Sequence, residues 1–135
     1  MDRKKAREYA FTVLFQYKFQ PEEVGDILAD FFLEHDAQNQ GEYIGDIVSG
    51  VVKKINEIDS KITEFSRGWT IDRINAVSLA ALRLGTYEIL YRDDVPPAVA
   101  VNEAVNLTRE YSGEEAIGFV NGVLGSIQRQ YEAKK

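Results

Sequence analysis

The chain has 135 residues, a formal net charge of −6 and a hydrophobic content of 44%. This size and composition suit one domain, or two small subdomains, around a buried core. The chain contains no cysteine, which excludes disulfides, thiolate metal ligands and a cysteine nucleophile, and suits a cytoplasmic protein. The negative net charge argues against nucleic-acid binding over the whole surface, so any such binding is expected to be local.

A basic cluster opens the chain. Arg3, Lys4, Lys5 and Arg7 fall within the first seven residues, whereas the acidic residues are spread over the remainder. A local basic arm on an acidic body can bind phosphates. On charge alone, however, the solvated start of a helix is the simpler interpretation.

The first predicted helix runs from Arg3 to Phe19, because apolar residues recur at helical spacing at Ala6, Ala10, Val13, Leu14 and Tyr17. Phe11 and Phe15 lie beside this apolar stripe. Together with Lys4 and Lys18 they form a basic and aromatic flank that could stack bases and neutralise phosphates. Core packing is the favoured role for Phe11, whereas packing and base stacking are evenly balanced for Phe15.

Pro21 predicts the start of a second helix, which is followed by a loop from Glu34 to Gly41. From Ile44 to Phe65, apolar residues then recur in steps of four and three, which is typical of a coiled-coil seam. A long helix within a bundle explains the same spacing, and we favour it, with a break near Asp59 and Ser60.

The central segment, Val77 to Tyr91, carries only two charged residues and has apolar residues on every helical face. It is too short for a membrane span, so it is predicted to be the buried central helix of a bundle. Thr70 is a candidate N-cap for a short preceding helix. Gly68 marks the predicted boundary between subdomains 1–68 and 69–135. Arg83, expected to be buried within the central helix, needs an anionic or carbonyl partner, for which Glu103 is a candidate. A structural role is favoured for Arg83, and contact with RNA is the alternative.

Pro97 restarts helical structure after the sequence RDDVPP. Ser112 and Glu115 have the spacing of a capping box, which predicts the start of the last helix. Phe119 falls at the edge of that helix's apolar stripe, so its ring can be partly exposed. Base stacking and packing against Val123 are equally compatible with this position.

Seven helical segments with short connections and no convincing strand give an all-α fold class. The sequence contains no nucleophile beside a base, no cluster of metal ligands and no phosphate-binding loop. We therefore expect neither an enzyme nor a resident metal or cofactor.

Three motifs, in this order and spacing, resemble those of the NusB family of bacterial transcription antitermination factors: KKAREYAFTVLFQYKF, ALRLGTYEILYRDDVPPAVAVNEAV and GFVNGVL. The resemblance covers nearly the whole chain and is weakest from Gln20 to Glu64. It implies two roughly perpendicular helical bundles. It also implies binding of single-stranded boxA-type RNA in ribosomal RNA transcripts, together with the small-subunit ribosomal protein NusE. The complex joins RNA polymerase and other Nus factors, and no reaction is catalysed.

The resemblance also implies roles for particular residues. Arg3, Lys4, Lys5 and Arg7 match the family's arginine-rich arm. RNA contacts are implied for four further residues, namely Phe15, Glu115, Phe119 and Asn121. The family usually has an acidic and then a basic residue where this chain has Ser78 and Leu79, and that acid helps to hold the ribosomal partner. Asp72 retains acidic character nearby, so Asp72 and Ser78 are the candidate partner-binding residues.

Two other functions fit parts of the sequence. One is a structural helical protein that forms a homodimer through the seam from Ile44 to Phe65. The other is a detached RNA-binding domain of an RNA methyltransferase system, since similar helical domains occur at the front of some of these enzymes. No glycine-rich nucleotide-binding unit follows the helices here, so methyl transfer would need a separate protein.

Overall fold

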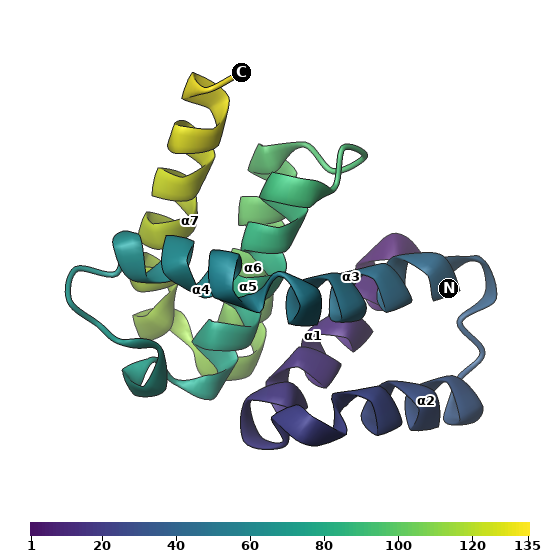
Figure 1. The fold of residues 1–135 in the computed structure, drawn as a ribbon. Helices are drawn as coiled ribbons and strands as arrows, with labels where there is room; N and C mark the ends of the chain where they lie inside the picture. The colour runs from purple at the N-terminus through teal and green to yellow at the C-terminus, as the bar shows by residue number, and fades with distance from the viewer.

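A computed structural model describes residues 1–135 and contains seven α-helices and no strand (Figure 1). The helices are α1 (Arg3–Phe19), α2 (Val24–Glu34), α3 (Gly41–Lys53), α4 (Ile55–Glu64), α5 (Ala76–Tyr91), α6 (Pro97–Ser112) and α7 (Ile117–Ala133). Four single-turn 3-10 helices connect them: η1 (Pro21–Glu23), η2 (Gln38–Gln40), η3 (Ile71–Arg73) and η4 (Glu114–Ala116). None of the helices combines the length and apolar character that crossing a membrane requires. The all-α prediction is confirmed.

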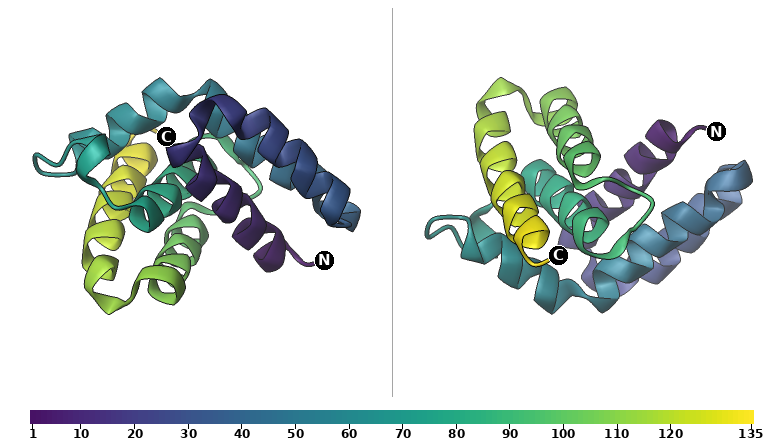
Figure 2. Two further views of the ribbon diagram at one scale, coloured as in Figure 1. Left: turned by 90° about the horizontal axis from the view of Figure 1, so that it is seen from below. Right: turned by 90° about the horizontal axis from the view of Figure 1, so that it is seen from above.

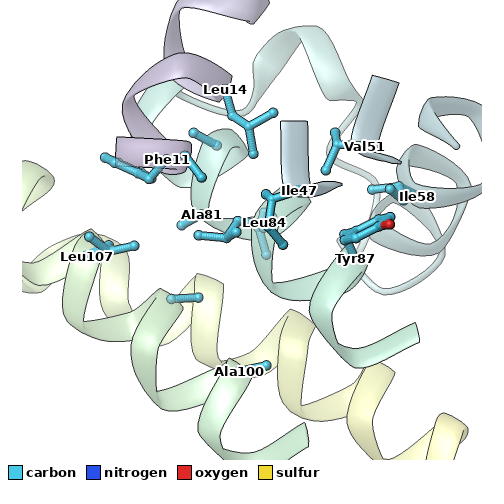
Figure 3. Close-up of a cluster of buried hydrophobic side chains, with 14 of the residues drawn as sticks. Phe11, Leu14, Ile47, Val51, Ile58, Ala81, Leu84, Tyr87, Ala100 and Leu107 are labelled. Carbon is cyan, nitrogen blue, oxygen red and sulfur yellow. The ribbon is translucent and has the colours of Figure 1, made fainter. Parts of the chain in front are cut away.

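Helix α5 is the centre of the molecule, as its composition predicted. Every residue from Ser78 to Ile89 is buried, and the helix packs against α1, α3, α4, α6 and α7. Asn75 caps its first turn, because the Asn75 side chain accepts a hydrogen bond from the backbone N–H of Ser78 at 2.9 Å. Figure 3 shows side chains of α1 and α3, among them Leu14 and Ile47, gathered above α5.

The helices form two roughly perpendicular bundles. In Figure 1, α3 and α4 run from side to side, whereas α6 and α7 run from the lower to the upper part of the picture. Figure 2 shows the same two groups of helices from below and from above. Gly68, with φ of +92°, lies in the turn between α4 and η3. One hydrophobic core of 32 buried residues nevertheless joins both halves of the chain. The division into folding units at residues 1–68 and 69–135 therefore stays a prediction.

The long helix predicted from Ile44 to Phe65 is broken, but at Lys54 rather than near Asp59 and Ser60. The bend lets α3 and α4 both lie against α5. The apolar residues of the proposed dimer seam fill the core: Ile44, Val48, Val51, Ile58 and Ile62 are at most 1% exposed. The alternative of a homodimer formed through this seam is therefore wrong, because other helices of the same chain already cover the seam residues.

The predicted capping box at Ser112 and Glu115 is also wrong. Helix α6 continues through Ser112 and ends at Gly113, where φ is +100°. The single turn of η4 precedes α7, and no side chain caps either helix start. Thr70 occupies the predicted N-cap position of η3, but its hydroxyl donates to the carboxylate of Asp72 at 2.6 Å instead of capping the backbone.

Candidate nucleic-acid interface

The predicted basic arm is the start of α1, and its side chains differ in exposure and in the partners that they contact. Lys4 is exposed and forms no ion pair. Lys5 is half-exposed and pairs with Glu8 at 3.2 Å. Arg3 donates to Gln40 at 2.9 Å, and its guanidinium lies 4.1 Å from the centre of the Tyr43 ring. Lys4 is thus the arm cation most available to a phosphate, followed by Lys5.

Arg7 departs from the expected arm, because it is only 5% exposed. Its Nε and Nη2 donate to the carboxylate of Glu88 at 3.0 and 3.1 Å, and the Tyr43 hydroxyl donates to the same carboxylate at 2.8 Å. Burial lowers the pKa of Arg7, but the hydrogen bonds and charge of Glu88 outweigh it, so the net shift of this pKa is upward. Arg7 is therefore half of a buried ion pair. The expectation that its guanidinium meets RNA does not fit this structure.

The aromatic flank of α1 is only partly open. Phe11 is buried, with its ring centre 5.1 Å from that of Tyr111, which confirms the packing role favoured for it. Phe15 is half-buried and meets the ring of Phe19 edge-on at 5.4 Å between centres. Lys18 forms no ion pair, but its Nζ donates to the carbonyl of Ile74 at 2.9 Å, which fixes the position of its side chain. This bond ties the end of α1 to the neighbouring groove.

That groove, which we call the Ser78 groove, has a volume of about 330 Å³ and lies where η3 and the start of α5 meet the end of α6 and the start of α7. It is lined by Trp69, Arg73, Ile74, Asn75, Ser78, Ser112, Glu115, Ala116 and Phe119. The structure thus brings the predicted RNA contacts Glu115 and Phe119 together with the predicted partner contact Ser78. Ser78 itself is only 1% exposed, so it contributes to the groove's floor.

Trp69 and Arg73 also line the Ser78 groove, and neither was predicted from the sequence to be a site residue. Trp69 is 50% exposed, and Arg73 is exposed without an ion pair. Both lie within a short turn that also contains Arg67. A tryptophan flanked closely by two arginines in a turn was the sequence feature that could have identified them.

A second groove, the Arg129 groove, lies on the other side of Phe119 and has a volume of about 430 Å³. Trp69 and Phe119 border both grooves, and Arg67 and Arg129 line only this one. The half-buried ring of Phe119 therefore forms part of the wall between two grooves that both contain arginine side chains. Asn121 is exposed but lines neither groove.

Asp72 is separate from this arrangement. It lines a third groove, of about 440 Å³, together with Tyr17, Lys18, Leu79 and Arg83 among others. The hydrogen bond from the Thr70 hydroxyl is the main cause that lowers the pKa of Asp72. The two predicted partner-binding residues, Asp72 and Ser78, therefore line different grooves.

Arg83 has the structural role predicted for it, but with another partner. Its Nε and Nη2 donate to the two carboxylate oxygens of Asp59 at 3.0 and 2.9 Å. This bidentate pair joins α5 to α4. The candidate Glu103 was wrong, since it lies instead 3.8 Å from Arg7.

Proteins similar to this chain in sequence and in fold all belong to one family. The model of the NusB family matches residues 4–129. A transcription antitermination protein NusB from Acetivibrio thermocellus is 44% identical over 128 residues, which cover 94% of this chain and 88% of the relative. The structure of T. maritima NusB has a TM-score of 0.88 and 30% identity, over 96% of this chain and 92% of the other.

A third similar structure contains the antitermination factors NusB and NusE in complex with dsRNA. Its matching chain has a TM-score of 0.86 and 34% identity, and the match covers 96% of this chain and 97% of that one. The fold, the order of the motifs and the matched length agree across these comparisons. The chain belongs to the NusB family of transcription antitermination proteins.

Proposed function

We propose that this protein binds single-stranded boxA-type RNA in ribosomal RNA transcripts, together with the ribosomal protein NusE. It acts in the cytoplasm, as part of an antitermination complex with RNA polymerase and other Nus factors. A related chain forms a complex with NusE and dsRNA. The observation that carries the proposal is the pair of aromatic rings, Trp69 and Phe119, that border two arginine-lined grooves. Exposed rings stack on bases, and cations without acidic partners neutralise phosphates.

The path proposed for the RNA begins at the arm. Lys4 and Lys5 meet phosphates at the start of α1, and Phe15 offers a ring further along the same helix. The bond from Lys18 to Ile74 brings the end of α1 to the rim of the Ser78 groove. There the RNA meets Phe119 and Arg73. These contacts bind and orient RNA, and the proposal assigns no chemical reaction to the protein.

Partner binding is proposed for the side of η3 that faces away from the Ser78 groove. Asp72 is exposed there, and its carboxylate is ionised near neutral pH, as that of an aspartate ordinarily is. An exposed carboxylate suits a basic ribosomal protein. Ser78, buried beneath the neighbouring groove, would influence the partner through the shape of that groove.

The replacement Phe119→Ala tests the RNA site directly. If the ring stacks on a base, the change weakens binding by about 1–3 kcal/mol and leaves the denaturant midpoint nearly unchanged. If the ring belongs to the core, the change costs about 3–5 kcal/mol of stability instead. Fluorescence anisotropy of a labelled boxA-like RNA, with and without NusE, measures the first effect, and urea unfolding measures the second.

The matched control is Phe32→Ala, which removes an exposed phenylalanine of α2, 39% exposed and outside both grooves. It should leave RNA affinity unaltered. A large drop in the urea midpoint of the Phe119 variant, with normal affinity at low temperature, would show that Phe119 is a packing residue and would remove the central support of the proposed site.

A further inference from the structure

Helix α2 presents a surface that the RNA-binding proposal does not use. The helix lies at the edge of the molecule, away from α5, α6 and α7 (Figure 1), and packs mainly against α1. Only Phe31 among its residues is buried. Leu33 is 85% exposed and Phe32 is 39% exposed. An outward leucine beside a partly exposed phenylalanine leaves α2 with an apolar face that no element of this chain covers.

The same segment carries the whole net charge of the protein. The chain has 22 acidic and 16 basic residues, and residues 21–36 contain six of the acids and none of the lysines or arginines. The other 16 acids are therefore balanced by the 16 bases. The other acids are spread over the chain, but the acidic excess is concentrated in this segment. None of the six acids forms a salt bridge, although acids elsewhere pair with Arg7, Arg83 and Arg92.

The acidic and apolar residues of α2 form two parallel stripes. Gly25, Ala29 and Leu33 follow one another at four-residue spacing, and so do Asp26, Asp30 and Glu34. Residues four apart lie one above the other on a helix, so the two stripes run side by side. All six residues are exposed. The backbone at Gly25 is also open, since a Cβ there would meet nothing within 4 Å, so another helix can approach closely.

A groove with both polar and apolar lining borders the acidic stripe on its other side. This groove, of about 300 Å³, runs between α1 and α2. Val13, Ile27 and Phe31 give it an apolar lining, and Asp30 and Glu34 are among its polar lining residues. The carboxylates thus lie between the exposed apolar stripe and a groove of mixed polarity. A ligand that is both apolar and cationic would complement this surface.

We propose that this α2 surface docks a basic amphipathic helix of a partner protein. Leucine-like side chains of the partner would pack on Ala29 and Leu33, and its lysines or arginines would meet Asp26, Asp30 and Glu34. RNA and anionic membranes are repelled by the unpaired acids. A second copy docked through the same face would set acids against acids. A cationic protein segment is the occupant that satisfies both stripes.

The test uses an 18-residue amphipathic peptide of leucine and lysine, labelled for anisotropy, and a peptide of the same composition whose order is scrambled to remove the apolar face. The wild-type protein should bind the amphipathic peptide at least tenfold more tightly than the scrambled one. Leu33→Ser, and separately Asp26→Asn with Asp30→Asn, should each weaken binding at least fivefold. All three changes are at exposed positions, and thermal melts check that the fold is retained.

The matched control is Asp93→Asn with Glu132→Gln, which removes two exposed acids from other elements and should leave peptide binding unchanged. No binding of the amphipathic peptide, equal binding of both peptides, or equal loss in the control variant would overturn the proposal. A dimer in sedimentation that Leu33→Ser dissociates would overturn it in favour of self-association. RNA titrations of the α2 variants should match those of the wild type, so this proposal and the RNA-binding proposal can fail separately.

Discussion

At the scale of single residues, the basic cluster at the start of the chain contains side chains with different roles. Lys4 and Lys5 are exposed, whereas Arg7 points into the core, where Glu88 is 0% exposed. The four positive charges are close together in the sequence, but the turn of the helix directs Lys4 and Lys5 to the surface and Arg7 to the core. Only the position of Glu88, 81 residues further along the chain, shows which charge is structural.

The Arg7→Met replacement should destabilise the protein by about 3–5 kcal/mol, because it leaves the buried carboxylate of Glu88 without its cation. Urea unfolding measures this loss. The double replacement Arg7→Met with Glu88→Gln should recover part of it, since the unpaired charge is then gone. A normal urea midpoint together with weakened RNA binding would return Arg7 to the RNA-binding arm.

Asp94 gives a prediction on pH. Two hydrogen bonds from Arg92, at 2.9 and 2.7 Å, with a further contribution from Arg3, lower the pKa of Asp94 to about 2. Since this pKa is below the value of about 3.9 for an unfolded chain, the ionised form stabilises the fold above pH 4, and the contribution is lost as the pH falls toward 2. The side chain is half-exposed, so solvent screening keeps the effect below about 1 kcal/mol.

Asp94→Asn should therefore be slightly less stable than the wild type at neutral pH, and the two unfolding free energies should converge near pH 2. Asp93→Asn is the control, since Asp93 is exposed beside it and belongs to none of the ion pairs around Arg92. A difference that persists unchanged at pH 2 would assign the effect to packing rather than to charge.

At the scale of elements, the contact between α3 and α5 depends on one glycine. A Cβ at Gly50 would lie 2.2 Å from the hydroxyl oxygen of Tyr87. That hydroxyl also donates to Asp46 at 3.0 Å, so the ring cannot move away without losing the bond. Gly50→Ala should cost about 1–3 kcal/mol through overpacking.

Gly45→Ala is the matched control within the same helix. A Cβ at Gly45 meets nothing within 4 Å, so alanine should be neutral or stabilise the protein by up to about 1 kcal/mol through its better helix propensity. Equal effects of the two substitutions in chemical denaturation would contradict the assigned contact.

The helices themselves could be predicted where periodicity is local. Apolar spacing gave α1 from Arg3 to Phe19, and the lack of a polar face identified α5 as the buried centre. The break at Lys54 could not be predicted, because it accompanies the packing of α3 and α4 on α5 rather than a local breaker residue. The prediction that Ser112 caps the last helix was wrong for a similar reason, because Ser112 is the last residue of α6.

The candidate site was predictable in part. The edge position of Phe119 followed from the stripe of α7, and the structure places Phe119 half-buried between two grooves. Trp69 and Arg73 come from a turn some fifty residues earlier in the chain, so only tertiary packing brings them beside that ring. Partners of buried charges, such as Asp59 for Arg83, were likewise set by helix packing rather than by spacing.

At the scale of the whole molecule, charge is distributed unevenly over the elements. Residues 21–36 carry the entire net negative charge, whereas the arm and the two Phe119 grooves carry lysines and arginines. The acidic excess therefore lies in a segment outside the proposed RNA path, so it does not have to be neutralised for RNA to bind the lysines and arginines. The net charge of −6 thus does not argue against local RNA binding.

Salt dependence provides the test of this division. If Lys4 and Lys5 neutralise phosphates, the logarithm of RNA affinity should fall with the logarithm of salt concentration by about 0.7 per contact. Replacing both lysines by alanine should therefore reduce the slope by up to about 1.4, and should weaken boxA-like and scrambled RNA alike, because phosphate contacts carry no sequence information. Anisotropy titrations over a series of salt concentrations measure both quantities.

The control replaces Lys53 and Lys134, two exposed lysines of other elements, by alanine, which changes the net charge by the same amount. Its slope should stay close to that of the wild type, because long-range charge effects are screened within about 10 Å at 0.1 M salt. Arg7→Met should keep the wild-type slope as well, since its guanidinium already belongs to Glu88. An arm variant that retains the full slope would show that the phosphates are bound elsewhere, and the arginines of the Phe119 grooves would then be the cations to replace.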